Sequence, residues 1–169
     1  MEKVGIIVFA FGAAKFGAPK TIRSNLILAE IAVKKSKELK AAIFTQRDIV
    51  ISEEMNVEYI KEKDKPPSTL KLAQAAVAWA IKNGIEEIII VAAKPHLSRV
   101  LRDMRMAAKE YGARLGIEIA EEIFLYSSND WFCPESIQLW TGNNVYWNIR
   151  ENVLLYIPFP IYKIISRLR

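Results

Sequence analysis

Apolar and polar residues occur along this chain in blocks whose spacing changes between continuous runs and the helical period. The first block, residues 4–11, is apolar throughout and ends at Gly12, which is typical of a strand buried on both faces of a parallel sheet. From Pro19 or Thr21 to about Leu39 the apolar positions recur near helical spacing, and proline is common in a first turn. The pattern therefore predicts a buried strand, a glycine-containing exit loop and a helix.

The segment after that helix carries weaker strand patterns. Residues 40–45 predict a short second strand, which is followed by a loop at 46–48. Residues 49–51 either continue this strand or open a new one, and residues 56–60 fit an edge strand. The polar run 61–65 then predicts a loop that leads into a second helix.

The clearest pattern in the chain is a helix followed by a buried strand. Ser68 is a good N-cap candidate for a helix whose apolar stripe stops at the Asn-Gly pair 83–84, a strong C-terminal signal. Residues 85–93 include four consecutive β-branched residues and predict a central strand. A third helix is expected to start near His96 and to end at Gly112.

The remaining residues complete the predicted fold. A further strand covers about residues 115–120 or continues to 124, and the aromatic-rich segment 127–169 is expected to be largely helical and to wrap the sheet. Strands and helices alternate, which predicts an α/β fold: a three-layer Rossmann-like domain with a mostly parallel sheet. No linker interrupts the pattern, so residues 1–169 are expected to form a single domain with 127–169 packed on it as a C-terminal extension.

Composition excludes several classes of protein. A chain of 169 residues, 51% of them hydrophobic, can bury a core without a disulfide or a structural metal. Cys133 is the sole cysteine and His96 the sole histidine, so an intrachain disulfide is excluded and a dedicated zinc site is not expected. No apolar run approaches the ~18 residues of a transmembrane span, and the apolar start fits a first strand better than a signal peptide. A cytoplasmic protein is the expectation.

The formal net charge of +5 favours anionic partners such as nucleotides, phosphorylated substrates or an acidic membrane surface. The basic residues are scattered, and their densest run, 34–40, fits a solvated helix face, so nucleic acid is not an expected partner. Residues 153–169 are apolar with basic residues at their end. This segment fits a membrane surface, a contact with another subunit, or a terminal helix packed on the sheet, and Pro158 and Pro160 are expected to break it into two pieces.

Candidate ligand-binding residues lie in the loops that follow the strands, because open α/β sheets bind ligands beyond the carboxyl ends of their strands. These residues are Gly12, Ala13 and Lys15 after the first strand, Thr45 and Gln46 after the second, Ser68 and Thr69 before the second helix, and Lys94 and Arg99 around the third helix start. The last loop is the richest. His96 precedes Arg99 by three positions, so the two side chains could hold one phosphate or carboxylate together.

His96 is the catalytic candidate. An imidazole can act as a general acid or base near neutral pH, but no acidic residue that could orient it is visible in the nearby sequence. A histidine at a helix start can also simply cap the backbone, and both interpretations stay open.

The same positions resemble a known family. Ser68-Thr69 before an amphipathic helix, the strand 88–91 and the run Pro95-His96-Leu97-Ser98-Arg99 resemble the SanA, ElyC and YdcF type of domain family, which carries a His-x-x-Arg motif after a strand. Glu151 is similar to the glutamate of that family's closing helix. The resemblance implies a nucleotide-like or phosphorylated ligand. Thr45-Gln46-Arg47 stands where the family has Ser-Gly-Gly, and Leu72 stands where it has Asn, which points to an altered activity.

Three hypotheses follow from the sequence. The first is a hydrolase or transferase that acts on a phosphorylated or nucleotide-like small molecule, with His96 and Arg99 at its anionic part. The second is a binding module without turnover for a nucleotide-type ligand such as S-adenosylmethionine. The third is an envelope-associated interaction protein that uses residues 153–169. No motif identifies a cofactor, and whether the chain is an enzyme at all stays open.

Overall fold

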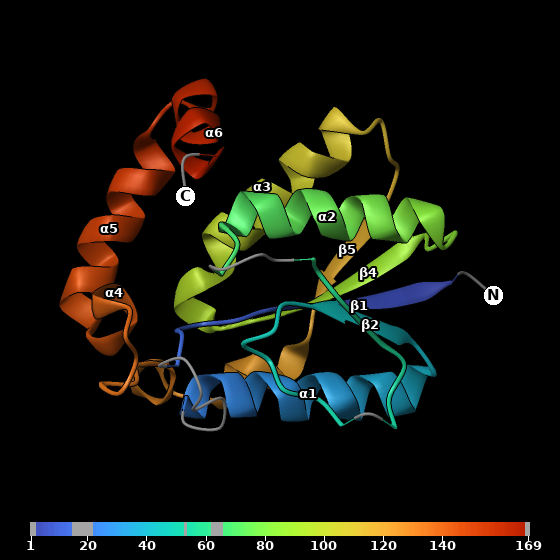
Figure 1. Cartoon of the computed structure of the whole chain (residues 1–169), viewed down its shortest axis with the longest axis horizontal. Helices are drawn as coiled ribbons and strands as arrows, with labels where there is room; N and C mark the ends of the chain where they lie inside the picture. Colours follow the sequence, from blue (N-terminus) through green and yellow to red (C-terminus); the bar gives the residue numbers. More distant parts are fainter. Residues whose placement is uncertain (1–2, 15–21, 53, 62–65, 168–169) are drawn as a thin grey trace.

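Five parallel strands form the centre of the molecule (Figure 1). The computed structural model describes residues 3–14, 22–52, 54–61 and 66–167. The strands are β1 (Val4–Phe9), β2 (Ala42–Thr45), β3 (Val57–Tyr59), β4 (Glu87–Ala92) and β5 (Gly116–Ile119), in the spatial order β3-β2-β1-β4-β5. Every neighbouring pair is parallel. The predicted α/β, Rossmann-like class is confirmed, and the sheet is parallel throughout.

The core of the sheet is the pair β1 and β4. All six residues of β1 are in register with β4, from Val4 opposite Glu87 to Phe9 opposite Ala92. Continuous runs of Ile and Val build both strands, and Ile6, Ile7 and Ile90 have no exposed surface. Such runs suit strands that are covered on both faces.

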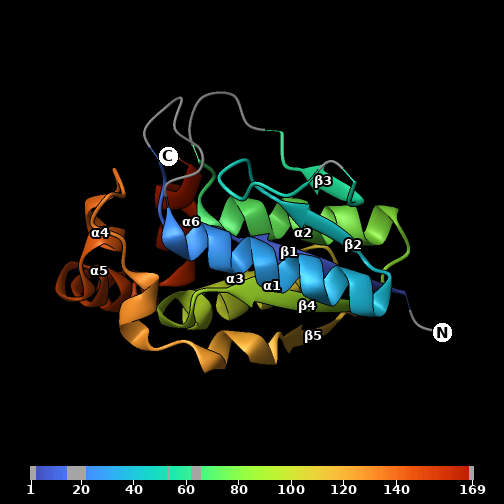
Figure 2. The same ribbon diagram turned by 90° about the horizontal axis from the view of Figure 1, so that it is seen from below.

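Helices cover both faces of the sheet (Figures 1 and 2). The main helices on the two faces are α1 (Arg23–Leu39), α2 (Thr69–Lys82) and α3 (Leu97–Glu110). Helix α1 lies on one face, and α2 and α3 lie side by side on the other. The long crossover through α2 carries the chain from the edge strand β3 to the far side of β1.

Several boundaries differ from the sequence-based expectation. β1 ends at Phe9 and not at residue 11, and residues 121–124 do not extend β5. Helix α1 is described from Arg23, after Ile22 with its extended backbone (φ −92°, ψ 103°), and the expected starts at Pro19 or Thr21 lie outside the described residues. Residues 49–51 form no strand: Ile49 and Ile51 are buried, but they lie in the loop between β2 and β3. Their apolar character reflects burial under a loop and not strand pairing.

The C-terminal segment crosses the edge of the sheet at which the strands end (Figure 1). Its elements are the short helices η2 (Glu121–Leu125) and η3 (Ser128–Trp131), followed by α4 (Leu139–Gly142), α5 (Asn144–Tyr156) and α6 (Phe159–Arg167). The break expected at the two prolines separates α5 from α6, and α6 packs against α2. None of the described helices is both long and apolar enough to cross a membrane.

The direction in which the chain adds strands to the sheet reverses between β1 and β4. The chain leaves β1 towards β2 on one side, and it leaves β4 towards β5 on the other. The two exit loops therefore part at the carboxyl edge and leave a crevice, the usual ligand position in open parallel sheets. In this molecule the crevice lies beneath the C-terminal helices.

Candidate functional site

A cavity of about 630 Å³ lies where the β1 and β4 exit loops part. Five segments line it: the exit loops of β1 and β2, the start of α2, the start of α3, and the C-terminal helices. The predicted site residues on its wall are Gly12, Ala13, Gln46, Ser68, Thr69, His96 and Arg99. The structure thus brings together residues that are far apart in the sequence.

Two candidate residues among those that the structure describes are not on this wall. Thr45 is fully buried in β2, and its hydroxyl donates to the Val8 carbonyl oxygen at 3.0 Å, so it serves the sheet. Lys94 starts the short helix η1 (Lys94–His96), where its side chain is exposed outside the cavity. Lys15 lies outside the described residues.

The β1 exit loop is fixed by side chains from the start of α1. The Asn25 side chain accepts a hydrogen bond from the Phe11 backbone N–H at 2.8 Å, and the Ser24 hydroxyl donates to the Phe11 carbonyl at 2.6 Å. Gly12 then turns with φ +109°, a backbone conformation that favours glycine, and a Cβ there would lie 3.1 Å from Ser136 Oγ. The loop therefore presents a narrow, preformed backbone wall to the cavity.

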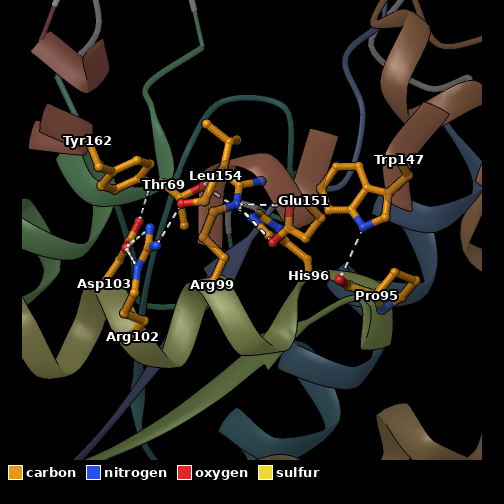
Figure 3. Close-up of polar contacts among 10 residues, drawn as sticks. All are labelled: Thr69, Pro95, His96, Arg99, Arg102, Asp103, Trp147, Glu151, Leu154 and Tyr162. Atoms are coloured by element: carbon orange, nitrogen blue, oxygen red, sulfur yellow. Dashed lines mark hydrogen bonds and ion pairs between the residues drawn. The ribbon is translucent and has the colours of Figure 1, made fainter. Parts of the chain in front are cut away.

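Arg99 is the best-connected cation of the site (Figure 3). It projects from the first turn of α3 and is almost fully buried. Its Nε lies 3.0 Å from both carboxylate oxygens of Glu151, and its Nη1 donates to Thr69 Oγ1 at 2.8 Å. Burial works against the charge of Arg99, but the Glu151 carboxylate raises the pKa of the guanidinium, which stays charged. These contacts use two of the five N–H groups that a guanidinium carries.

His96 sits in an aromatic environment. Its ring packs against Phe9, Phe11 and Trp147 with centroid distances of 6.4, 6.1 and 5.4 Å. Burial, reinforced by the positive charges of Arg99 and Arg150, holds the pKa of His96 well below its ordinary value. His96 is therefore neutral at pH 7. Its side chain makes no capping hydrogen bond to α3, so the interpretation of His96 as a backbone cap is wrong.

The hydrogen-bond network gives an expectation for the tautomer of this neutral ring. Arg99 can only donate, so Thr69 Oγ1 is an acceptor towards Nη1. The single hydroxyl hydrogen of Thr69 is then available for His96 Nε2, which lies 3.1 Å from Thr69 Oγ1. We therefore expect Nε2 to accept this hydrogen bond and the proton to be on Nδ1. Among the described residues Nδ1 has no hydrogen-bond partner.

Further contacts fasten the C-terminal helices over the cavity (Figure 3). The Trp147 indole N–H donates to the Pro95 carbonyl at 3.1 Å, and the Tyr162 hydroxyl donates to Asp103 Oδ2 at 2.6 Å. Arg102 bridges Asp103 and the Leu154 carbonyl, with its guanidinium 4.1 Å from the Tyr162 ring centroid. Helix α3 thus serves as the anchor for both α5 and α6.

Sequence reasoning did not include the residues that α5 adds to the site. Trp147 and Arg150 line the cavity, and Glu151 holds Arg99 beneath it. Glu151 did carry a signal, since the sequence pattern alone singled it out as a residue of the closing helix. Trp147 and Arg150 carried no such signal beyond the aromatic richness of their segment. Their positions in the sequence do not indicate which helix covers a cavity.

The described residues contain no group of three or more His, Cys, Asp or Glu side chains that could hold a metal ion. The polar chemistry of the cavity consists of two guanidiniums, a neutral imidazole, hydroxyls and amides. No family model matches the chain, and no curated protein or solved structure matches it either.

Proposed function

We propose that this chain is a hydrolase or transferase that acts on a phosphorylated or nucleotide-like small molecule bound in the cavity between the β1 and β4 exit loops. One observation carries the proposal: Thr69 at the start of α2 meets His96 and Arg99 from the start of α3 at the wall of one cavity. Guanidinium and hydroxyl donors at a helix start are a common arrangement for binding phosphate or carboxylate oxygens.

The charge of the cavity favours an anionic ligand. Arg99 and Arg150 both line it, and none of the described residues on its wall is acidic. Glu151 offsets the charge of Arg99, and Arg150 adds a second cation to the wall, where its guanidinium lies 5.5 Å from the Trp147 ring centroid. S-Adenosylmethionine carries a positive sulfonium next to its nucleoside, so the pair of guanidiniums disfavours it against a phosphorylated ligand.

The size and the apolar lining favour an organic body on that anion. About 630 Å³ falls within the usual range of small-molecule pockets. Phe11, Trp140 and Trp147 supply aromatic surface, on which a nucleobase or another flat ring can stack. The resemblance of the His-x-x-Arg motif to the SanA, ElyC and YdcF type of family supports the same ligand class.

Ligand binding is tested by calorimetry with adenosine monophosphate, a hexose phosphate, adenosine and S-adenosylmethionine. We expect the phosphorylated compounds to bind and the two others to bind weakly or not at all. Arg150→Gln should weaken phosphate-ester binding by about tenfold to one hundredfold, the loss expected for one charge-assisted hydrogen bond. Arg105→Gln, at an exposed position on α3 away from the cavity, removes the same charge and should leave binding unchanged.

The outcomes separate the alternatives. If Arg150→Gln and Arg105→Gln changed binding equally, the proposed site would be wrong. If neither phosphorylated compound bound, the proposed ligand class would be wrong. Turnover is followed by phosphorus NMR of the bound ester during long incubation. A ligand recovered intact would leave a binding module in place of an enzyme.

A further inference from the structure

The outward face of α5 is an apolar stripe. Val145, Ile149, Val153 and Tyr156 are 63, 58, 56 and 86% exposed and are spaced four, four and three residues apart, which places them on one side of a helix. Trp147 and Glu151, on the opposite side, are buried against the cavity. The outer side of α5 is therefore apolar, whereas a helix at the surface of a monomer is normally polar on its outer side.

This stripe differs from the other exposed apolar residues of the molecule. Ile81 on α2 and Tyr111 after α3 are exposed singly and to half or less, as is common on any protein surface. Other exposed apolar residues gather in smaller groups, such as Phe124 with Leu125 and Leu26 with Val50. On the outer edge beyond the sheet, by contrast, α5 carries four such residues in a row, and Ile161 and Ile164 follow on α6 (Figure 1). Concentrated exposure of this kind is typical of an interaction surface.

The stripe is flanked by neutral side chains. The exposed polar residues of α5 are Asn144, Asn148 and Asn152, and the helix's charged residues, Arg150 and Glu151, belong to its cavity side. In a chain of net charge +5, this face is uncharged. A two-fold symmetric contact places a surface against itself, so it needs a face that does not repel itself.

The same feature argues against a membrane as the occupant. Helices that lie on membranes carry Lys and Arg on their polar face, which attract the anionic lipid surface. The polar face of α5 has asparagines in those positions, and Lys163, the basic side chain of α6 that the structure describes, is paired with Glu110. We infer that a second copy of this chain covers the stripe, so that two α5 helices pack against each other about a two-fold axis.

The inferred dimer does not depend on the proposed function. A helix of 13 residues is about 20 Å long, so the contact is at the small end of protein interfaces, and the dimer is expected to dissociate in about the micromolar range. The partner helix would also hold α5 down over Arg99. It would therefore stabilise the wall of the cavity without contributing a residue to it.

Sedimentation velocity on the full chain between about 1 and 200 µM tests the inference. The mass should rise with concentration from 19.2 kDa towards twice that value. Ile149→Glu should keep the protein monomeric throughout, because each copy would bring a charge to the same apolar contact. Ile81→Glu, a matched change at a 48% exposed position on α2, should leave the dimer intact, and circular dichroism should show both variants folded.

Three results would overturn the inference. The wild type could stay monomeric at the highest concentration, or it could form a dimer that Ile149→Glu does not dissociate. A monomer that sediments with vesicles of phosphatidylglycerol and phosphatidylcholine, and loses this binding with Ile149→Glu, would make a membrane the occupant of the stripe.

Discussion

The sheet and the C-terminal helices both border the cavity, but different forces hold them there. β1 and β4 are paired over their full length and buried in aliphatic side chains. Helices α5 and α6 expose much of their apolar surface and are fastened by a few polar contacts, chiefly Arg99 with Glu151, Trp147 with Pro95 and Tyr162 with Asp103. The framework of the site thus rests on aliphatic packing, whereas its cover combines the packing of a few aromatic rings, such as Trp147 on Phe11, with buried charges and hydrogen bonds.

This difference predicts that charge substitutions affect the cover and leave the framework in place. Glu151→Gln should lower the free energy of unfolding of the cover by about 3–5 kcal/mol, because it leaves the buried Arg99 charge uncompensated. Urea unfolding and hydrogen exchange measure this effect. Amide protection in α5 should collapse while protection in β4 persists.

Two further variants sharpen the test. Glu121→Gln, the same change at an exposed position, should alter stability by less than about 0.5 kcal/mol. Ile88→Ala, at a fully buried position in β4, should cost about 2–5 kcal/mol through the cavity it leaves, with loss of protection in sheet and cover together. If Glu151→Gln reduced protection in β4 as much as in α5, the two regions would be one cooperative unit and the comparison would fail.

The next prediction concerns pH. His96 is neutral in the folded protein, but in the unfolded chain it takes up a proton near pH 6.5. The unfolded state therefore binds more protons below that pH, and the free energy of unfolding should fall there by up to about 1.4 kcal/mol per pH unit. This decrease in the free energy of unfolding is complete only below the pKa that His96 has in the unfolded chain, and it is absent well above that pKa.

A comparison with His96→Gln isolates this contribution. Urea unfolding of both proteins across the range from weakly acid to neutral pH should give curves that converge as the pH falls. The buried Asp103 carboxyl, whose pKa is raised by burial, acts with the opposite sign but is present in both proteins and cancels. Parallel curves would contradict the neutral imidazole.

The smallest expected effect is on the tautomer of His96. Nitrogen NMR of the imidazole can be read without assignment, because the chain has a single histidine. The wild type and Thr69→Ser should show the proton on Nδ1. Thr69→Val removes the hydroxyl that donates to Nε2, so the proton should no longer be confined to Nδ1. A wild-type spectrum with the proton on Nε2 would show that the hydroxyl accepts from both neighbours.

The sequence was sufficient for the framework because its signals are local. The β-branched run at 88–91 and the Asn-Gly pair at 83–84 each predict structure within a few residues, and the structure agrees. The prediction of a strand at 49–51 failed, because the buried Ile49 and Ile51 give the same apolar pattern beneath a loop as they would in a strand. Local patterns identify which residues are buried more reliably than they identify the element that buries them.

The cover of the site could not be predicted in the same way. Arg99 and Glu151 are separated by 52 positions, and no periodicity relates them. Thr45 had the right place in the strand order, but its hydroxyl turns to the Val8 carbonyl because that acceptor lies within the sheet. Side-chain direction at a strand end depends on such tertiary contacts, and a single sequence does not contain them.

The layout of the chain also has a practical consequence for handling the protein. β1 begins at the amino edge of the sheet, at the end of the molecule opposite the cavity, whereas Tyr162 and Ser166 of the last helix line the cavity itself (Figure 1). An affinity tag or surface linker joined before β1 therefore leaves the mouth of the cavity accessible. Attachment after α6 places foreign chain beside the ligand, so immobilised binding assays should use the amino end.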